Sequence, residues 1–179
     1  MPQLYTRSGD NGTTTLHDMY NVSKADWIFK VIGDLEELSA HIGLLCVSLK
    51  KYANETDSKY ADHVRFLRKV QMKLTELGNN FATAQWRQNV VKTTTEDVKN
   101  LEAQIDFLTT ESVLLTCGES DCHAYICRAI CRRAERNMWT LVELEESNRV
   151  ENEAFQYMNR LSSYFYALAR YLTQNQKLI

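Results

Sequence analysis

Four arginines crowd one short stretch of the chain, and their spacing points to the binding of a polyanion. Arg128, Arg132 and Arg136 stand four residues apart, so on a helix their guanidinium groups would line one face. Like charges at this spacing repel by about 0.2–0.5 kcal/mol per pair. Glu135 can neutralise only part of the charge that these three and Arg133 carry. The remainder suits a nucleotide triphosphate or the acidic surface of a partner protein.

Polar residues elsewhere in the chain could complete such a site. Glu36 and Glu37 are candidate partners for the arginines, although exposed ion pairs contribute only about 0–1 kcal/mol. Asn159 and Arg160 interrupt an otherwise apolar helical pattern. They could satisfy the polar atoms of a ligand, or they could form a buried pair that holds two helices in register. The sequence leaves both interpretations open.

A turn-rich stretch near the amino terminus is the second candidate. Residues 6–15 read Thr-Arg-Ser-Gly-Asp-Asn-Gly-Thr-Thr-Thr, in which Gly9 and Gly12 permit positive φ angles and close backbone approach. The Asp-Asn-Gly turn favours successive N–H groups that point into one concavity, and Arg7 and the later Lys24 add positive charge. The stretch could cradle phosphates, although it is not a Walker A loop. Taken alone, it also fits an ordinary solvated turn with a surface lysine.

The composition disfavours several other classes of protein. The 179 residues carry a net charge of −2, which gives no general case for nucleic-acid binding. No apolar run approaches the roughly 20 residues of a membrane-spanning helix, and residues 1–10 resemble neither a signal peptide nor a transit peptide. The four histidines lack metal-ligand spacing, so we expect no His or Cys metal site. The odd set of cysteines predicts reduced thiols in a cytoplasmic protein: Cys46, Cys117, Cys122, Cys127 and Cys131.

The periodicity of apolar residues predicts five helices that would position these groups. One proline and six glycines leave long uninterrupted segments. Apolar residues recur every three or four positions in four of the segments, which are residues 28–49, 60–81, 98–108 and 155–172. The remaining helix carries the arginines and is expected to run to about Glu146. Short loops between five helices predict an all-α, antiparallel bundle with an irregular amino-terminal segment, in a single domain of residues 1–179.

Capping residues mark where these helices should begin. A side-chain oxygen at the first position can accept a hydrogen bond from an otherwise unpaired backbone N–H. The residues expected to cap the first, third and fourth helices are Ser23 with Asp26, Thr95, and Ser120 or Asp121.

These clusters, in this order, resemble the PduO-type ATP:cob(I)alamin adenosyltransferases, which include the mitochondrial enzyme of animals. The resemblance spans nearly the whole chain, and the amino-terminal and arginine-rich motifs together are specific. The stretches that carry it are Thr6–Thr14, Val22–Asp26, Gly33–Gly43, Cys131–Arg136 and Asn159–Tyr166.

The resemblance implies a homotrimer of five-helix bundles with active sites between subunits. Such an enzyme transfers the 5′-deoxyadenosyl group of ATP to the cobalt of reduced cob(I)alamin and releases triphosphate. No general base is needed, because Co(I) is the nucleophile. The arginines, with Mg²⁺ that accompanies ATP, would stabilise charge on the departing triphosphate. A cobalamin-dependent enzyme that receives the product would be a further partner.

The family pattern also assigns roles to individual residues. Arg128, Arg132 and Glu36 are expected to be catalytic, with Arg128 paired to Glu36 across the subunit interface. The residues expected to bind ATP are Thr6, Arg7, Ser8, Gly9, Asp10, Gly12, Thr13, Thr14, Lys24, Arg132, Arg133, Ala134, Glu135, Arg136 and Asn159.

Several positions depart from the family pattern. Glu36 stands in place of an aspartate, and residues 17–20 replace a region that usually holds a Gly-Gly pair. On the corrinoid side, Val113 replaces a phenylalanine that helps to push the lower ligand off cobalt, and Ser163 replaces an aspartate. The departures leave an alternative, a catalytically weakened protein of the same fold that binds or delivers ATP or corrinoid. A third interpretation is a structural helical bundle whose arginines dock an acidic partner.

Overall fold

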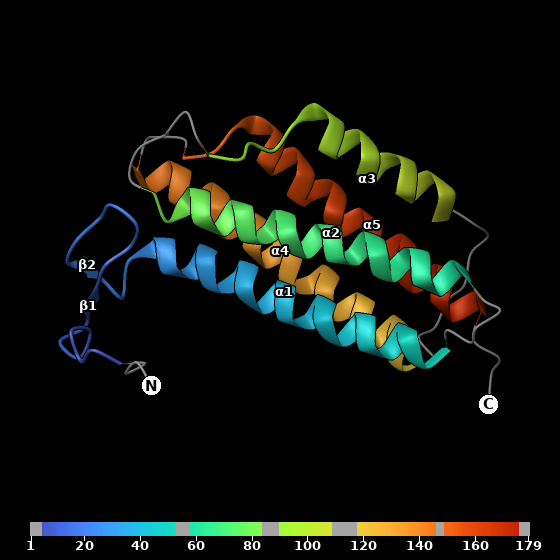
Figure 1. Ribbon diagram of the computed structural model, residues 1–179. Coiled ribbons are helices and arrows are strands. Elements are labelled where there is room, and N and C mark those ends of the chain that lie inside the picture. Colours follow the sequence, from blue (N-terminus) through green and yellow to red (C-terminus); the bar gives the residue numbers. More distant parts are fainter. Residues whose placement is uncertain (1–4, 53–57, 84–89, 109–117, 146–148, 176–179) are drawn as a thin grey trace.

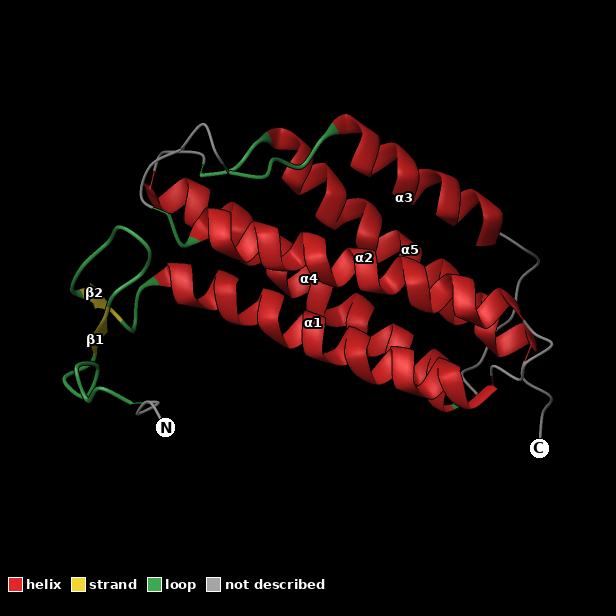
Figure 2. Ribbon diagram, viewed as in Figure 1, coloured by secondary structure: helices red, strands yellow, loops and turns green. Residues whose placement is uncertain are grey.

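Five helices and one short hairpin make up the computed structural model, which describes residues 5–52, 58–83, 90–108, 118–145 and 149–175 (Figures 1 and 2). The helices are α1 (Trp27–Tyr52), α2 (Ser58–Phe81), α3 (Thr95–Leu108), α4 (Glu119–Glu145) and α5 (Asn152–Asn175). The strands are β1 (Thr13–Thr14) and β2 (Val22–Ser23). The expected all-α five-helix fold is confirmed. No described helix combines the length and apolarity needed to span a bilayer.

Four of the helices surround one core, and α3 lies against the outer side of α5. Helix α1 packs on α2 and α4, and α4 packs on α5. Successive helices alternate in direction, whereas α3 and α5 run in the same direction (Figure 1). Two contacts with the same sequence separation of 58 residues join this parallel pair. They are Thr95 with Glu153 at 3.5 Å, and Arg160 with Glu102 at 2.8 Å.

The core is built from the apolar positions that the periodicity selected. Every such residue that defined the patterns in α1, α2 and α5 is buried, and only Ile105 of the α3 pattern is partly exposed. Burial of one large aliphatic or aromatic side chain contributes about 1.5–3 kcal/mol. The residues at the centres of these patterns are Leu38, Leu45, Leu67, Leu74, Met158 and Leu161.

The helix starts differ from the expected ones by one to three residues. Helix α1 is capped by Asp26, whose carboxylate accepts from the Ile28 N–H at 3.0 Å, and Ser23 forms only a local turn. Helix α3 is capped by Thr94 rather than Thr95, because the Thr94 hydroxyl accepts from the Asp97 N–H at 3.2 Å. Serine, threonine and aspartate are all competent caps, so their sequence alone does not select one.

Neither residue expected to cap α4 lies at its first position. Ser120 and Asp121 are both buried inside the first turn. The Asp121 carboxylate accepts from the Gly118 N–H at 2.9 Å, which is the reciprocal half of a capping box. Ser120 is 2.5 Å from Ser48 of α1, so these small polar residues hold two helices close together.

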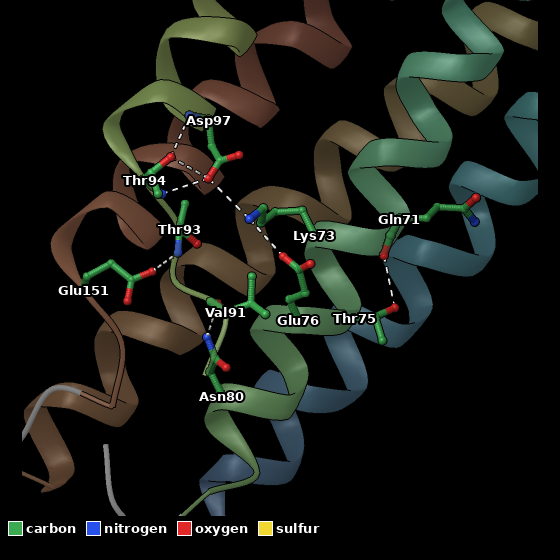
Figure 3. Close-up of polar contacts among 10 residues, drawn as sticks. All are labelled: Gln71, Lys73, Thr75, Glu76, Asn80, Val91, Thr93, Thr94, Asp97 and Glu151. Atoms are coloured by element: carbon green, nitrogen blue, oxygen red, sulfur yellow. Dashed lines mark hydrogen bonds and ion pairs between the residues drawn. The ribbon is translucent and has the colours of Figure 1, made fainter. Parts of the chain in front are cut away.

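A polar network joins the ends of α2, α3 and α5 (Figure 3). Lys73 of α2 lies 2.8 Å from Glu76 and 3.3 Å from Asp97, and Glu151 accepts from the Thr93 N–H. Burial lowers the pKa of Lys73, but the bond to Glu76 and the charge of Asp97 outweigh it, so the net pKa is raised. The lysine is therefore held in its charged form between two carboxylates.

The amino-terminal segment contains a small β-ladder that the sequence did not predict. Thr13–Thr14 pairs antiparallel with Val22–Ser23, and the Lys24 N–H donates to the Gly12 carbonyl at 2.8 Å. Two residues per strand are too few for the alternating pattern by which strands are recognised.

One arginine ties this hairpin to the bundle. Two nitrogens of Arg149 lie 2.5 and 2.6 Å from the carboxylate oxygens of Glu145 at the end of α4. Its remaining terminal nitrogen donates to the Thr83 carbonyl at 3.1 Å and lies 3.6 Å from the sulfur of Met19. The hairpin, the end of α2 and the end of α4 are thereby fixed relative to one another.

The described cysteines are free thiols, as expected. Cys46, Cys127 and Cys131 are buried and Cys122 is exposed, while Cys117 lies outside the described residues. Burial raises the pKa of Cys127 to about 12. Such thiols are poor nucleophiles, and they serve as core residues.

Candidate functional site

The arginines of α4 divide into two pairs with different surroundings. Arg128 points toward α5, where it donates to the Ser162 carbonyl at 2.9 Å. Its guanidinium carbon also lies 4.9 Å from the centre of the Tyr166 ring. A cation over an aromatic face is stabilised by the ring's quadrupole. These two contacts orient the guanidinium of Arg128 against α5.

Arg133 points in the other direction, toward α1. Its Nε donates to Asp34 at 2.8 Å, and a terminal nitrogen donates to Glu37. Asn137 donates to the second oxygen of Asp34 at 2.6 Å. The prediction that Glu37 pairs with an arginine is confirmed. The main partner, Asp34, was missed, although its place one residue before the buried Leu35 was a usable signal.

Arg132 and Arg136 form the second pair, on the side of α4 that faces solvent. Both are exposed, and neither guanidinium group makes a hydrogen bond or ion pair with any residue that the structure describes. Their spacing of four residues places them on adjacent turns of one face. Ala134 is 0% exposed, so in this subunit its side chain has no surface to offer a ligand.

A chain of polar contacts crosses from α4 to α5 and α3 beside these arginines. Asn159 donates to Glu135 at 3.0 Å and accepts from Arg160 at 2.8 Å. Arg160 in turn reaches Glu102 at 2.8 Å. The two residues therefore link helices, as one of the open interpretations held, but they do so at the surface. Asn159 remains exposed and accessible to a ligand.

The amino-terminal turn, residues 6–14, is the candidate phosphate cradle and contains two left-handed backbone conformations. Arg7 adopts a φ of 62° and Gly12 a φ of 81°. A non-glycine residue rarely adopts a left-handed conformation, and such outliers cluster at ligand sites. The Thr6 and Ser8 hydroxyls lie 2.7 Å apart, and the Asp10 N–H donates to the Arg7 carbonyl at 3.3 Å. The turn thus gathers hydroxyl and N–H groups, most of them exposed.

Lys24 lies directly over this turn. A Cβ placed on Gly9 would be 3.0 Å from the Lys24 ammonium nitrogen and 3.3 Å from its Cε. Only glycine leaves the ammonium this close to the backbone. The structure therefore brings Lys24 and the turn together, as the phosphate-cradle interpretation requires.

Some of the predicted residues are not brought together in this chain. The hairpin and its turn lie at one end of the bundle, beside the start of α1 (Figure 1). Among the described residues, no hydrogen bond or ion pair joins residues 6–14 to the arginines of α4, or Glu36 to Arg128. Glu36 instead borders a groove of about 600 Å³ between α1 and α2. Ser163 is half-buried on α5, and Val113 lies outside the described residues.

Comparison with known proteins identifies a family model and relatives that match most of this chain. The family model for cobalamin adenosyltransferase covers residues 4–172. Corrinoid adenosyltransferase MMAB of Homo sapiens is 30% identical, with 98% of this chain and 71% of the human protein covered. Corrinoid adenosyltransferase of Bacillus subtilis is 33% identical, with 94% and 85% covered.

Solved structures show the same fold. A variant PduO-type ATP:corrinoid adenosyltransferase from Lactobacillus reuteri, complexed with cobalamin and ATP, superposes with a TM-score of 0.78 at 24% identity. The match covers 96% of this chain and 91% of that chain. The sequence and fold together place this chain in the cobalamin adenosyltransferase family.

Proposed function

We propose that this chain transfers the 5′-deoxyadenosyl group of ATP to the cobalt of reduced cob(I)alamin, which yields adenosylcobalamin and triphosphate. The observation that carries the proposal is the pair of exposed guanidiniums of Arg132 and Arg136, which have no bonding partner among the residues described. An anion cradle with Lys24 already in place supports it. Both elements are arranged to bind a triphosphate, and the family to which the chain belongs uses ATP in this reaction.

The described residues suggest a division of labour. The turn around Gly9 and Lys24 would bind the phosphates, while Arg132 and Arg136 would stabilise the charge that develops as triphosphate departs. Asn159 and Glu135 would contact the nucleoside. Mg²⁺ would enter with ATP, since this ion is usually held by phosphate oxygens, waters and one or two carboxylates. The Co(I) electron pair attacks the 5′ carbon as the bond to the phosphate oxygen breaks.

We further propose a homotrimer in which each active site lies between two subunits. The cradle lies at one end of the bundle, and Arg132 lies midway along α4, which favours contributions from different subunits. Apolar side chains exposed on the neighbouring helices α1 and α4, among them Leu44, Val47 and Ile126, support an interface there. Across such an interface Glu36 would reach Arg128, and Ser163 and Val113 would lie on the corrinoid side.

Two further parts of the proposal concern the cell. Buried thiols with raised pKa values suit a reducing compartment, so we propose a cytoplasmic location. A cobalamin-dependent enzyme would then receive the product.

An anaerobic assay with Co(I) corrinoid, Mg²⁺ and ATP tests the function. Adenosylcobalamin should form, as followed by its absorption spectrum, together with one triphosphate per adenosyl group transferred. The Arg136→Lys variant, which keeps the charge, serves as a matched control for Arg136→Ala.

The outcomes separate the three interpretations. Binding of ATP and corrinoid without adenosyl transfer would contradict the enzyme and support a binding or delivery protein. Absence of ATP binding in calorimetry would leave only a structural interaction module.

A further inference from the structure

A pocket of about 450 Å³ opens between α4 and α5. Glu135 and Trp139 face it from successive turns of α4, and Phe155 and Asn159 face it from successive turns of α5. Two of these residues, Glu135 and Asn159, already belong to the proposed ATP site. The aromatic pair at the other end of the pocket has no role in the site as described so far.

Trp139 is the large aromatic side chain that lines this pocket from α4. One face of its indole packs on Phe155, with ring centres 4.2 Å apart and planes inclined by 33°. The side chain nevertheless remains 47% exposed. A large aromatic residue that is supported on one side and open on the other is suited to stack on a planar ring. Stacking of a nucleic-acid base on such a side chain tolerates any base, because every base has a π-face.

The remaining lining of the pocket comes from α5 and consists of Arg160 and two amide side chains. Asn152 and Gln156 are both exposed along the rim of α5. Each amide offers a donor and an acceptor. Adenine presents an amino donor beside a ring-nitrogen acceptor on one edge, which an amide can match.

The spacing along α4 fits a nucleotide laid along the helix. Arg132 precedes Trp139 by seven residues and Arg136 precedes it by three, which corresponds to about 10 and 5 Å along the helix axis. A ribose separates the base of ATP from its phosphates, so the base would lie near Trp139 when the phosphates lie near these two arginines. We propose that Trp139, supported by Phe155, is the stacking platform for the adenine ring and a determinant of nucleotide affinity. The proposal rests on the proposed function, because it places the base of the same ATP.

The test compares binding of ATP and of inorganic triphosphate, which has no base, by calorimetry. The Trp139→Ala variant should bind ATP about five- to hundredfold more weakly than the wild type and should bind triphosphate equally well. Trp139→Phe should recover most of the ATP affinity. Leu144→Ala, which removes another exposed apolar side chain of α4, is the matched control and should leave both affinities unchanged. Sedimentation of each variant checks that its assembly is that of the wild type.

Each outcome decides the proposal. Equal ATP affinity in wild type and Trp139→Ala would overturn it and leave the proposed function intact. An equal loss of ATP and triphosphate affinity would also overturn it, since the loss would not depend on the base. Selective loss of ATP affinity in a protein that transfers no adenosyl group would support the platform and contradict the enzyme. Absence of ATP binding in the wild type would overturn both.

Discussion

The two pairs of arginines on α4 differ in what surrounds them. Arg128 and Arg133 lean toward α5 and α1, where a carbonyl, an aromatic ring and carboxylates bind them. Arg132 and Arg136 face solvent without such partners among the described residues. The first pair adds to the packing of the bundle, whereas the second keeps its full capacity to bind an anion. The arginine-rich motif therefore serves two functions, because its members point in different directions around α4.

The largest expected effect comes from removing an unbonded arginine. Arg132→Ala should remove about 3–4 kcal/mol of transition-state stabilisation, by analogy with the loss of an oxyanion donor. Adenosyl transfer should slow accordingly. The midpoint of thermal unfolding should not change, because the side chain makes no described contact. Steady-state kinetics and calorimetric melting measure the two quantities. Wild-type turnover would refute the assignment.

Removal of a bonded arginine should instead lower the free energy of unfolding. Arg133→Ala leaves the buried Asp34 with Asn137 as the remaining side-chain donor to its carboxylate among the described residues. An under-satisfied buried acceptor costs about 1–3 kcal/mol, which urea unfolding should report as a lower free energy of unfolding. The additional change Asp34→Asn should recover part of this loss, because an amide carries no charge. If Arg133→Ala were as stable as the wild type, the division into two pairs would fail.

A smaller effect is expected in the cradle. Gly9→Ala should move the flexible end of Lys24 rather than unfold the turn, because the new Cβ meets only side-chain atoms within about 3.3 Å. ATP affinity should fall roughly three- to tenfold, part of the about 1.5–3 kcal/mol that a charged hydrogen bond contributes. Gly78→Ala, where an added Cβ meets nothing within 4 Å, is the control. If Gly9→Ala and Gly78→Ala bound ATP with equal affinity, the proposed contact between Lys24 and the phosphates would be wrong.

The smallest effect is expected for Asp97 of α3, a bonded acid that is not part of the proposed ATP site. Burial raises the pKa of Asp97, but hydrogen bonds from Thr94 and the charge of Lys73 outweigh it, so the net pKa is lowered from its usual value (Figure 3). Its stabilisation is therefore complete at neutral pH and is lost as the pH falls through this lowered pKa. Asp97→Asn should cost about 1 kcal/mol at pH 7, typical of a helix cap, and progressively less below about pH 4. Thermal melts across this range would show a constant difference if the prediction were wrong.

The fold was largely predictable because its main signal is local. The spacing of the apolar residues in α1, α2 and α5 can be read directly from the sequence, and this spacing predicts which of them are buried. The exact helix starts were not predictable, since Ser23 and Asp26 are both competent caps and the tertiary packing selects between them. The ladder formed by Thr13–Thr14 was too short to leave a pattern.

The candidate site was predictable in its residue types but not in its pairings. The sequence offered Glu36 and Glu37 as partners for the arginines, whereas Arg133 binds Asp34 and Glu37. Positions 34 and 36 are two residues apart, so they differ by about 200° around a helix. Which of them meets α4 depends on how α1 is rotated, and that depends on the whole core. Trp139 was overlooked for a related reason, because it belongs to no apolar seam and gains significance only beside Phe155.

The amino-terminal hairpin has one further consequence. Its ladder, the bond from the Lys24 N–H to the Gly12 carbonyl and the contact of Arg149 with Met19 tie the cradle to the bundle. Ordering a loose loop on binding would cost about 1–2 kcal/mol of backbone entropy per residue. A preorganised cradle avoids that cost, so nucleotide binding should proceed with little loss of conformational entropy in this segment, and its amide hydrogens should exchange slowly even in the free protein.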